Sequence, residues 1–174
     1  MNELNLLSFS HIFVVFICVA SIVFIPKLFK NSLPSTHTNL AYFIIALILI
    51  NQGMDLYREG YLDQWKLGLP LHLCDFSSFS ILIYLLTKKR DFFIFAFFFG
   101  IAGAGMSILT PDTGYGFPAV AYIQNQIGHT AIILGVSYAM VIDGQRPYLK
   151  DVARALGFAT ILLFIMYGVN YLLG

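Results

Sequence analysis

Residues 69–78, LPLHLCDFSS, bring three side chains capable of covalent or acid–base chemistry into one short stretch. Pro70 suits the first turn of a helix, where its missing N–H costs nothing. His72 and Asp75 are three residues apart and then share one helix face, so the carboxylate can orient the imidazole and support its protonated form. Cys74 lies near the positive end of the helix dipole with a histidine close by, which favours a thiolate nucleophile. The stretch predicts thiol chemistry, while the alternative for the cysteine is inert helix packing.

A second polar stripe, AYIQNQIGHT at residues 121–130, interrupts a long apolar run. Asn125 and Gln126 lie four and three residues before His129, so both can share its side of a helix. An ionisable residue inside a membrane span is costly and indicates a functional site. His129 can act as the general base for Cys74, and the two amides can stabilise an oxyanion. The alternative is a histidine packed between helices by hydrogen bonds.

Two further carboxylates are candidates for substrate binding. Asp55 ends the segment NQGMD and shares a helix face with Asn51. Asp112 follows Pro111 in LTPDTGYGFP, a turn signature, and it can cover the mouth of a site. We expect Asp55 and Asp112 to join Gln126 and Asn125 in binding the substrate.

The elements that must position these groups are membrane helices. The chain is 59% hydrophobic and only 11% charged, whereas soluble domains average about 45–50% apolar and about 25% charged residues. Each of six apolar runs is long enough to cross a hydrocarbon layer of about 30 Å. The runs cover residues 9–29, 40–57, 70–87, 92–109, 118–142 and 152–173. The sequence therefore predicts an all-α polytopic transmembrane bundle of about six spans, forming a single domain over residues 1–174.

Basic residues predict the orientation of the spans. Cytoplasmic loops carry an excess of Lys and Arg. Eight such residues follow the odd-numbered spans, and two lie on the other side: Lys27, Lys30, Lys88, Lys89, Arg90, Arg146, Lys150 and Arg154 against Arg58 and Lys66. Both ends of the chain are then predicted to face outward, with the candidate site toward the outer leaflet of the cell membrane. The outward acids are Glu3, Asp55, Glu59, Asp63, Asp75 and Asp112, while Asp91, Asp143 and Asp151 are expected to be ordinary interfacial charges or caps.

Four elements together carry a family resemblance: LPLHLCD at 69–75, LTPD at 109–112, His129 and NYLLG at 170–174. They resemble the YwaF-like integral membrane proteins of bacteria, which have animal relatives described as acyltransferases of ether phospholipids. The resemblance covers the chain from the second span to the end. It implies a catalytic pair of Cys74 and His129, with His72, Asp75 and Asp112 at recurrent motif positions. It also implies a further hydrophobic segment after Gly174.

These observations predict a thiol-dependent lipid acyltransferase or lipid hydrolase whose partners are membrane lipids. One alternative is a small-solute or proton-coupled transporter with His72, Asp75, His129 and Asp55 as a relay. Others are a b-type haem protein with His72 and His129 as axial ligands, and a membrane protein without chemistry. We expect no metal and no cofactor, and the net charge of +1 gives no indication of nucleic-acid binding. The sequence predicts no oligomeric state.

Overall fold

The computed structural model describes residues 3–58, 66 and 69–173, and every regular element in these ranges is a helix. The elements are α1 (Phe9–Phe29), α2 (Pro34–Asp55), α3 (Leu73–Thr87), α4 (Arg90–Phe95), η2 (Ala96–Gly100), α5 (Ile101–Leu109), α6 (Val120–Val141) and α7 (Leu149–Leu173). The π-helical turn η2 joins α4 and α5 into one long rod. The predicted residues Glu59, Asp63 and Gly174 lie outside the described ranges.

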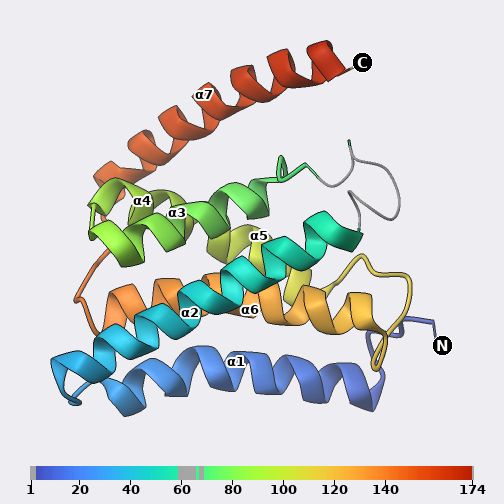
Figure 1. The fold of residues 1–174 in the computed structure, drawn as a ribbon, viewed down its shortest axis with the longest axis horizontal. Coiled ribbons are helices and arrows are strands. Elements are labelled where there is room, and N and C mark those ends of the chain that lie inside the picture. The colour runs from blue at the N-terminus through green and yellow to red at the C-terminus, as the bar shows by residue number, and fades with distance from the viewer. Residues whose placement is uncertain (1–2, 59–65, 67–68, 174) are drawn as a thin grey trace.

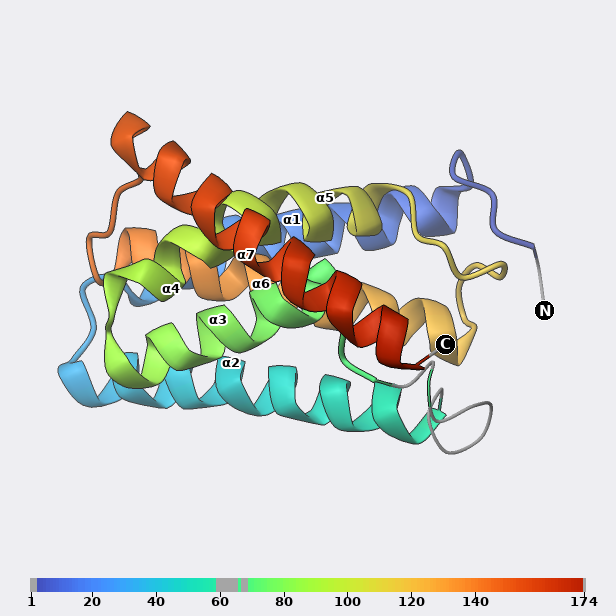
Figure 2. The ribbon, with the colours of Figure 1, turned by 90° about the horizontal axis from the view of Figure 1, so that it is seen from above.

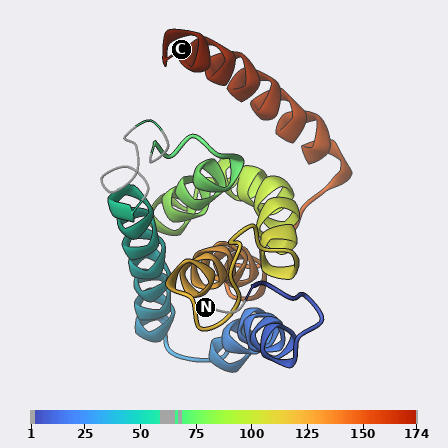
Figure 3. The same cartoon turned by 90° about the vertical axis from the view of Figure 1, so that its right-hand side faces the viewer.

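The helices lie side by side with both chain ends at the same end of the bundle (Figure 1). Helix α6 occupies the centre, and α1, α2, α3 and the η2–α5 rod surround it (Figure 3). Helix α7 lies apart, crosses obliquely over the other helices (Figure 2) and makes its main contact with α4. Five elements pack against α6, and its polar residues Gln124 and Gln126 are buried among them.

Length and composition make four of the described helices suitable for crossing a membrane, namely Phe9–Phe29, Pro34–Arg58, Arg90–Leu109 and Leu149–Leu173. Helix α3 is apolar but has only 15 residues, which gives it a length of about 22 Å at 1.5 Å per residue. Helix α6 has 22 residues but carries the polar stripe predicted from the sequence. The all-helical membrane fold is thus confirmed, while the number of crossings stays a prediction.

Two predicted helix starts were wrong. Helix α2 begins at Pro34 and not at residue 40, so His37 lies in its first turns. Proline is favoured at the first helical position, and His37 Nε2 donates to the Phe29 carbonyl at the end of α1, 2.8 Å away. Helix α3 begins at Leu73, so Pro70 precedes the helix and does not open it.

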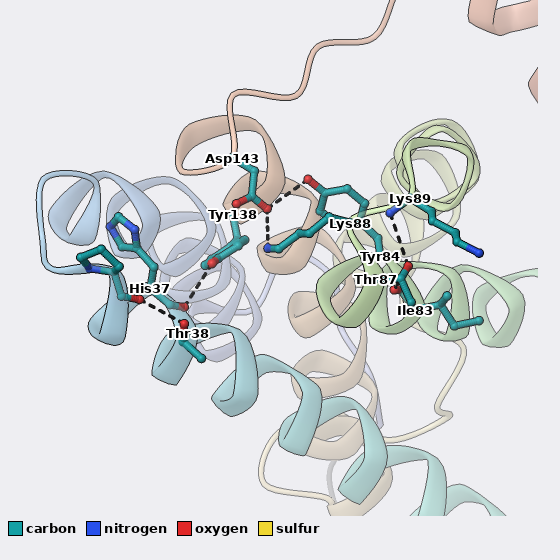
Figure 4. Close-up of polar contacts among 10 residues, drawn as sticks. His37, Thr38, Ile83, Tyr84, Thr87, Lys88, Lys89, Tyr138 and Asp143 are labelled. Carbon is teal, nitrogen blue, oxygen red and sulfur yellow. Dashed lines mark hydrogen bonds and ion pairs between the residues drawn. The ribbon is translucent and has the colours of Figure 1, made fainter.

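Hydrogen bonds and an ion pair connect the helices at the end of the bundle opposite the chain termini (Figure 4). Lys88 Nζ lies 2.7 Å from Asp143 Oδ2, which also accepts a hydrogen bond of 3.0 Å from the Tyr84 hydroxyl. The Tyr138 hydroxyl donates to the His37 carbonyl at 3.1 Å. These contacts join α2, α3 and the end of α6.

The other two acids at this end also have basic partners. Arg90 donates to both oxygens of Asp151, at 2.9 and 2.7 Å, and so attaches α7 to α4. Arg154 lies 3.8 Å from Asp91. All three acids therefore make local ion pairs. Asp151 differs from the expected interfacial charges because it is fully buried, and it caps the start of α7 by accepting from the Tyr148 N–H at 2.8 Å.

Lys88, Arg90, Arg146 and Arg154 lie at the end of the bundle opposite the chain termini, whereas Arg58 lies at the end that holds the candidate site. Which end faces the cytoplasm stays a prediction.

Candidate functional site

A cavity of about 480 Å³ lies between the end of α2, the start of α3, the first half of α6 and the loop 110–119. Seven of the eight predicted site residues line it: Asp55, His72, Cys74, Asp75, Asp112, Asn125 and His129. The structure thus brings together groups from three helices and a loop that are far apart in the sequence. Their catalytic and binding roles stay predictions.

Cys74 sits in the first turn of α3 and is half-buried. Its sulfur faces α5 across Gly103, where an added Cβ would lie 3.3 Å from Sγ. Because Gly103 has no side chain, there is room for the Cys74 sulfur beside α5. The negative charge of Asp75, one residue along, opposes a second negative charge on Cys74. Proton transfer to a nearby base is the direct way to activate this thiol.

Asp75 is held by donors from two elements. Gln52 Nε2 of α2 donates to Oδ1 at 3.0 Å, and the His72 backbone N–H donates to Oδ2 at 2.9 Å. The second bond satisfies an amide at the N-terminus of α3 that has no acceptor within the helix. His72 Nδ1 lies 3.4 Å from the same oxygen, but the imidazole is 76% exposed against 14% for Asp75. His72 therefore stands at the cavity mouth, while Asp75 forms part of its wall.

The two ring nitrogens of His129 in α6 differ in their contacts with the described residues. Its Nδ1 lies 2.8 Å from the Asn125 carbonyl oxygen, which can only accept, so Nδ1 carries the proton of the neutral ring. Nε2 then holds a lone pair, and no described residue is recorded as its hydrogen-bond partner. A neutral imidazole in this tautomer can accept a proton within the cavity.

The two amides beside His129 point in different directions. Asn125 faces the cavity, but Ser107 of α5 occupies both ends of its amide. The Ser107 hydroxyl donates to Asn125 Oδ1 at 3.0 Å, and Asn125 Nδ2 donates to the Ser107 carbonyl at 3.1 Å. Gln126 is buried and does not line the cavity; it donates to the Ile108 carbonyl at 3.1 Å and accepts from Cys18 at 3.9 Å. Successive helix residues point about 100° apart, so with Asn125 facing the cavity, Gln126 points away from it, toward Cys18 of α1 and Ile108 of α5.

A polar chain links α2 to α6 on the other side of the cavity. Asp55 accepts hydrogen bonds from Asn51 Nδ2 at 3.0 Å and from Gln124 Nε2 at 2.5 Å. Arg58 Nη1 in turn donates to Gln124 Oε1 at 3.1 Å. Asp55 is thus anchored within a network of amides and a guanidinium, and Arg58 brings a positive charge to the cavity wall.

Sequence reasoning missed Gln52, Gln124 and Arg58 as parts of this site. Both glutamines stood beside residues that were singled out, and an amide within an apolar run was the available signal. His11, which the sequence did not single out, is buried. Its Nδ1 accepts from the Tyr122 hydroxyl at 2.8 Å and its Nε2 donates to the Leu109 carbonyl at 3.0 Å.

No group of three or more His, Cys, Asp or Glu side chains within the described ranges could hold a metal ion. Residues 6–174 match the family model described as the TMEM164 family. No curated protein and no solved structure matches the chain.

Proposed function

The chain belongs to the TMEM164 family, and from that premise we propose that it transfers acyl groups between membrane lipids through a thioester on Cys74. One observation carries the proposal: Cys74 of α3 and His129 of α6 line the same cavity, and His129 Nε2 has no hydrogen-bond partner within the described ranges. A nucleophile and a base that share one site are the minimum that thiol-based acyl transfer requires. The sequence resemblance to lipid acyltransferases agrees with this chemistry.

In the first half-reaction, Cys74 Sγ attacks the carbonyl carbon of a lipid ester while His129 Nε2 takes the thiol proton. An S–C bond forms, and the ester C–O bond breaks when the tetrahedral intermediate collapses. The departing lipid oxygen takes the proton from His129 Nε2 and leaves as an alcohol. The acyl group remains on Cys74 as a thioester, and the imidazole is neutral again.

In the second half-reaction, the hydroxyl of an acceptor lipid attacks the thioester carbonyl and gives its proton to His129 Nε2. The new C–O bond forms, the S–C bond breaks, and the proton returns to the Cys74 sulfur. If water takes the place of the acceptor, the same steps release a fatty acid and the protein acts as a lipid hydrolase. Neither half-reaction needs a metal or a redox partner.

Backbone donors at the start of α3 are suited to stabilising the oxyanion. The first N–H groups of a helix have no acceptor within it, and those of Leu73 and Cys74 have no recorded acceptor among the residues described. The amides suggested by the sequence are less suitable, because Asn125 is engaged by Ser107 and Gln126 faces away. Preorganised donors of this kind can lower the barrier by several kcal/mol, typically about 3.

Packing beneath the cavity favours lipid chemistry over the alternative of a proton-coupled transporter. Ile44, Ile81 and Ile132, from three different helices, are at most 2% exposed. They form an apolar layer between the cavity and the Lys88–Asp143 end of the bundle. A proton or ion relay from His129 would have to cross this layer, whereas acyl transfer needs access only from the cavity mouth. With the orientation predicted by the basic residues, that mouth faces the outer leaflet of the cell membrane.

The test uses the full chain in liposomes that contain a phospholipid donor with an isotopically labelled acyl chain and a lysophospholipid acceptor. We expect label on the acceptor and, after quenching, an acyl mass increment on Cys74 that hydroxylamine removes. Cys74→Ala should abolish both signals and His129→Gln should greatly slow both. Cys18→Ala is the matched control, since Cys18 lies outside the cavity and should leave transfer unchanged. Equal transfer by wild type and Cys74→Ala would refute the proposal.

A further inference from the structure

The joint between α4 and α7 brings together charged groups from three segments of the chain. Arg90 of α4 pairs with the buried Asp151 of α7 at 2.7 Å, and Arg154 of α7 lies 3.8 Å from Asp91 of α4. Arg90 also donates to the carbonyl of Arg146, in the loop between α6 and α7, at 2.8 Å. The two helices and the loop are therefore held at one point, at the end of the bundle opposite the chain termini (Figure 1).

Two cations of this joint meet at the ring of Tyr148. Arg90 Cζ lies 5.1 Å and Lys150 Nζ 5.6 Å from the ring centroid, both within the reach of a cation–π contact. The charge of Arg90 is offset by Asp151, whereas no acid within the described ranges lies at ion-pair distance from Lys150. The joint thus carries an uncompensated positive charge beside a half-exposed aromatic ring.

Lys89 and Arg146 add two more positive charges to the joint. Both side chains are exposed, and neither has an acidic partner in the part of the chain that the structure describes. Lys89 directly precedes Arg90, and Arg146 donates only to backbone carbonyls at the end of α6. Because the three acids at this end are already paired, an anion from outside the chain has to balance these charges.

Exposed apolar side chains lie next to the cations. Leu149 and Val152, in the first turn of α7, are 90% and 38% exposed, and Tyr148 is 55% exposed. Lysines beside an aromatic ring and bare apolar groups are typical of the boundary between head groups and acyl chains. A free anion would contact only the charges, whereas an anionic lipid has a phosphate for the lysines and chains for Leu149.

We propose that the joint between α4 and α7 binds an anionic phospholipid, with the head-group phosphate at Lys89 and Lys150 and the acyl chains against Leu149. This site lies at the opposite end of the bundle from the cavity, so its occupant is distinct from the lipid substrate of the proposed acyl transfer. Basic residues next to a membrane span attract anionic lipids. Since α7 makes its main contact with α4, a lipid that bridges the joint would also hold α7 in place.

The test titrates the full chain in micelles with phosphatidylglycerol or phosphatidylcholine and counts bound lipids by native mass spectrometry. Lys89→Gln/Lys150→Gln removes two charges from the joint. The matched control, Lys27→Gln/Lys30→Gln, removes two exposed charges from α1 at the same end of the bundle. A third variant, Lys89→Arg/Lys150→Arg, changes the same positions but keeps their charge.

We expect phosphatidylglycerol to bind more tightly than phosphatidylcholine. Its affinity should fall about 20-fold in Lys89→Gln/Lys150→Gln, because each lysine near a membrane surface contributes about fivefold, and it should change little in the α1 control and in the arginine variant. Equal losses in the two glutamine variants, no rescue by arginine, or equal binding of both lipids would overturn the proposal. Displacement of phosphatidylglycerol by an equal concentration of inorganic phosphate would also overturn it, since the site would then recognise the anion alone. The assay involves no turnover, so a failure of acyl transfer would not affect it.

Discussion

Gly128, the residue before His129, is the point at which α6 meets α2 most closely beside the site. A Cβ added there would lie 2.3 Å from Asn51 Nδ2, 2.6 Å from Cγ and 2.8 Å from Oδ1, whereas ordinary contact begins near 3.4 Å. Asn51 cannot withdraw freely, because its Nδ2 donates to Asp55. Gly128→Ala must therefore displace Asn51 and break that bond, or push the two helices apart.

The expected cost follows from three terms. Overpacking of this kind costs about 1–3 kcal/mol, and loss of the bond between Asn51 and Asp55 costs about 0.5–1.5 kcal/mol. The higher helix propensity of alanine offsets this by up to about 1 kcal/mol. We therefore expect Gly128→Ala to lower the free energy of unfolding by about 2 kcal/mol. In Gly105→Ala the new Cβ meets nothing within 4 Å, so that control should gain up to about 1 kcal/mol.

The measurement is reversible unfolding in mixed micelles with increasing SDS, followed by far-UV circular dichroism, for both glycine variants. The double variant Asn51→Ala/Gly128→Ala gives a further check, since removing the Asn51 amide removes the clash. It should be more stable than Gly128→Ala alone. If Gly128→Ala unfolds at the same SDS fraction as Gly105→Ala, the close approach of α2 and α6 at this point is refuted.

Three further outcomes are expected. His11→Phe should destabilise the protein by about 1–3 kcal/mol in the same unfolding assay, because it leaves the buried Tyr122 hydroxyl and the Leu109 carbonyl without their hydrogen bonds to His11. The rate of acyl transfer per folded molecule should stay unchanged. Gln52→Leu should slow acyl transfer, because it removes a hydrogen-bond donor from Asp75. The mass of the folded protein–micelle complex in light scattering should not change, and an unchanged rate would remove Gln52 from the site. Iodoacetamide should label Cys74 faster than the buried Cys18 in the folded protein, and equal labelling would contradict their different burial.

Apolar runs were sufficient to predict the helices, because a chain with 59% hydrophobic residues and few charges has little alternative in a membrane. Helix ends were harder to predict. The first residues of α2 are polar and resemble a loop, and Pro34 and the contact of His37 with α1 extend the helix over them. The start of α3 depends on Asp75, whose side chain accepts a hydrogen bond from the His72 backbone N–H. Gln52 of α2 donates to the same carboxylate. Such tertiary contacts have no local sequence signal.

The side of the bundle that holds the site was predictable from polar residues, but the direction of individual side chains was not. Asn125 and Gln126 are neighbours of the same type, and only one faces the cavity. An amphipathic helix reveals its rotation through its apolar stripe, but α6 contacts helices on all sides and carries buried residues on every face. Its rotation is determined by which neighbours accept its hydrogen bonds, so Gln126 and Asn125 could be told apart only from the positions of α1 and α5.

The π-helical turn η2 shows how far the site depends on a feature without a sequence signature. A π turn places one extra residue in an otherwise regular helix, and one residue corresponds to about 100° of rotation. Helix α5 is therefore turned relative to α4, so Gly103 faces the sulfur of Cys74 and Gly100 faces Ser77 and Ile132. With an unbroken α-helix over residues 90–109, bulkier neighbours would rotate toward α3. The space beside Cys74 therefore depends on the π-helical turn, which determines that Gly103 faces α3.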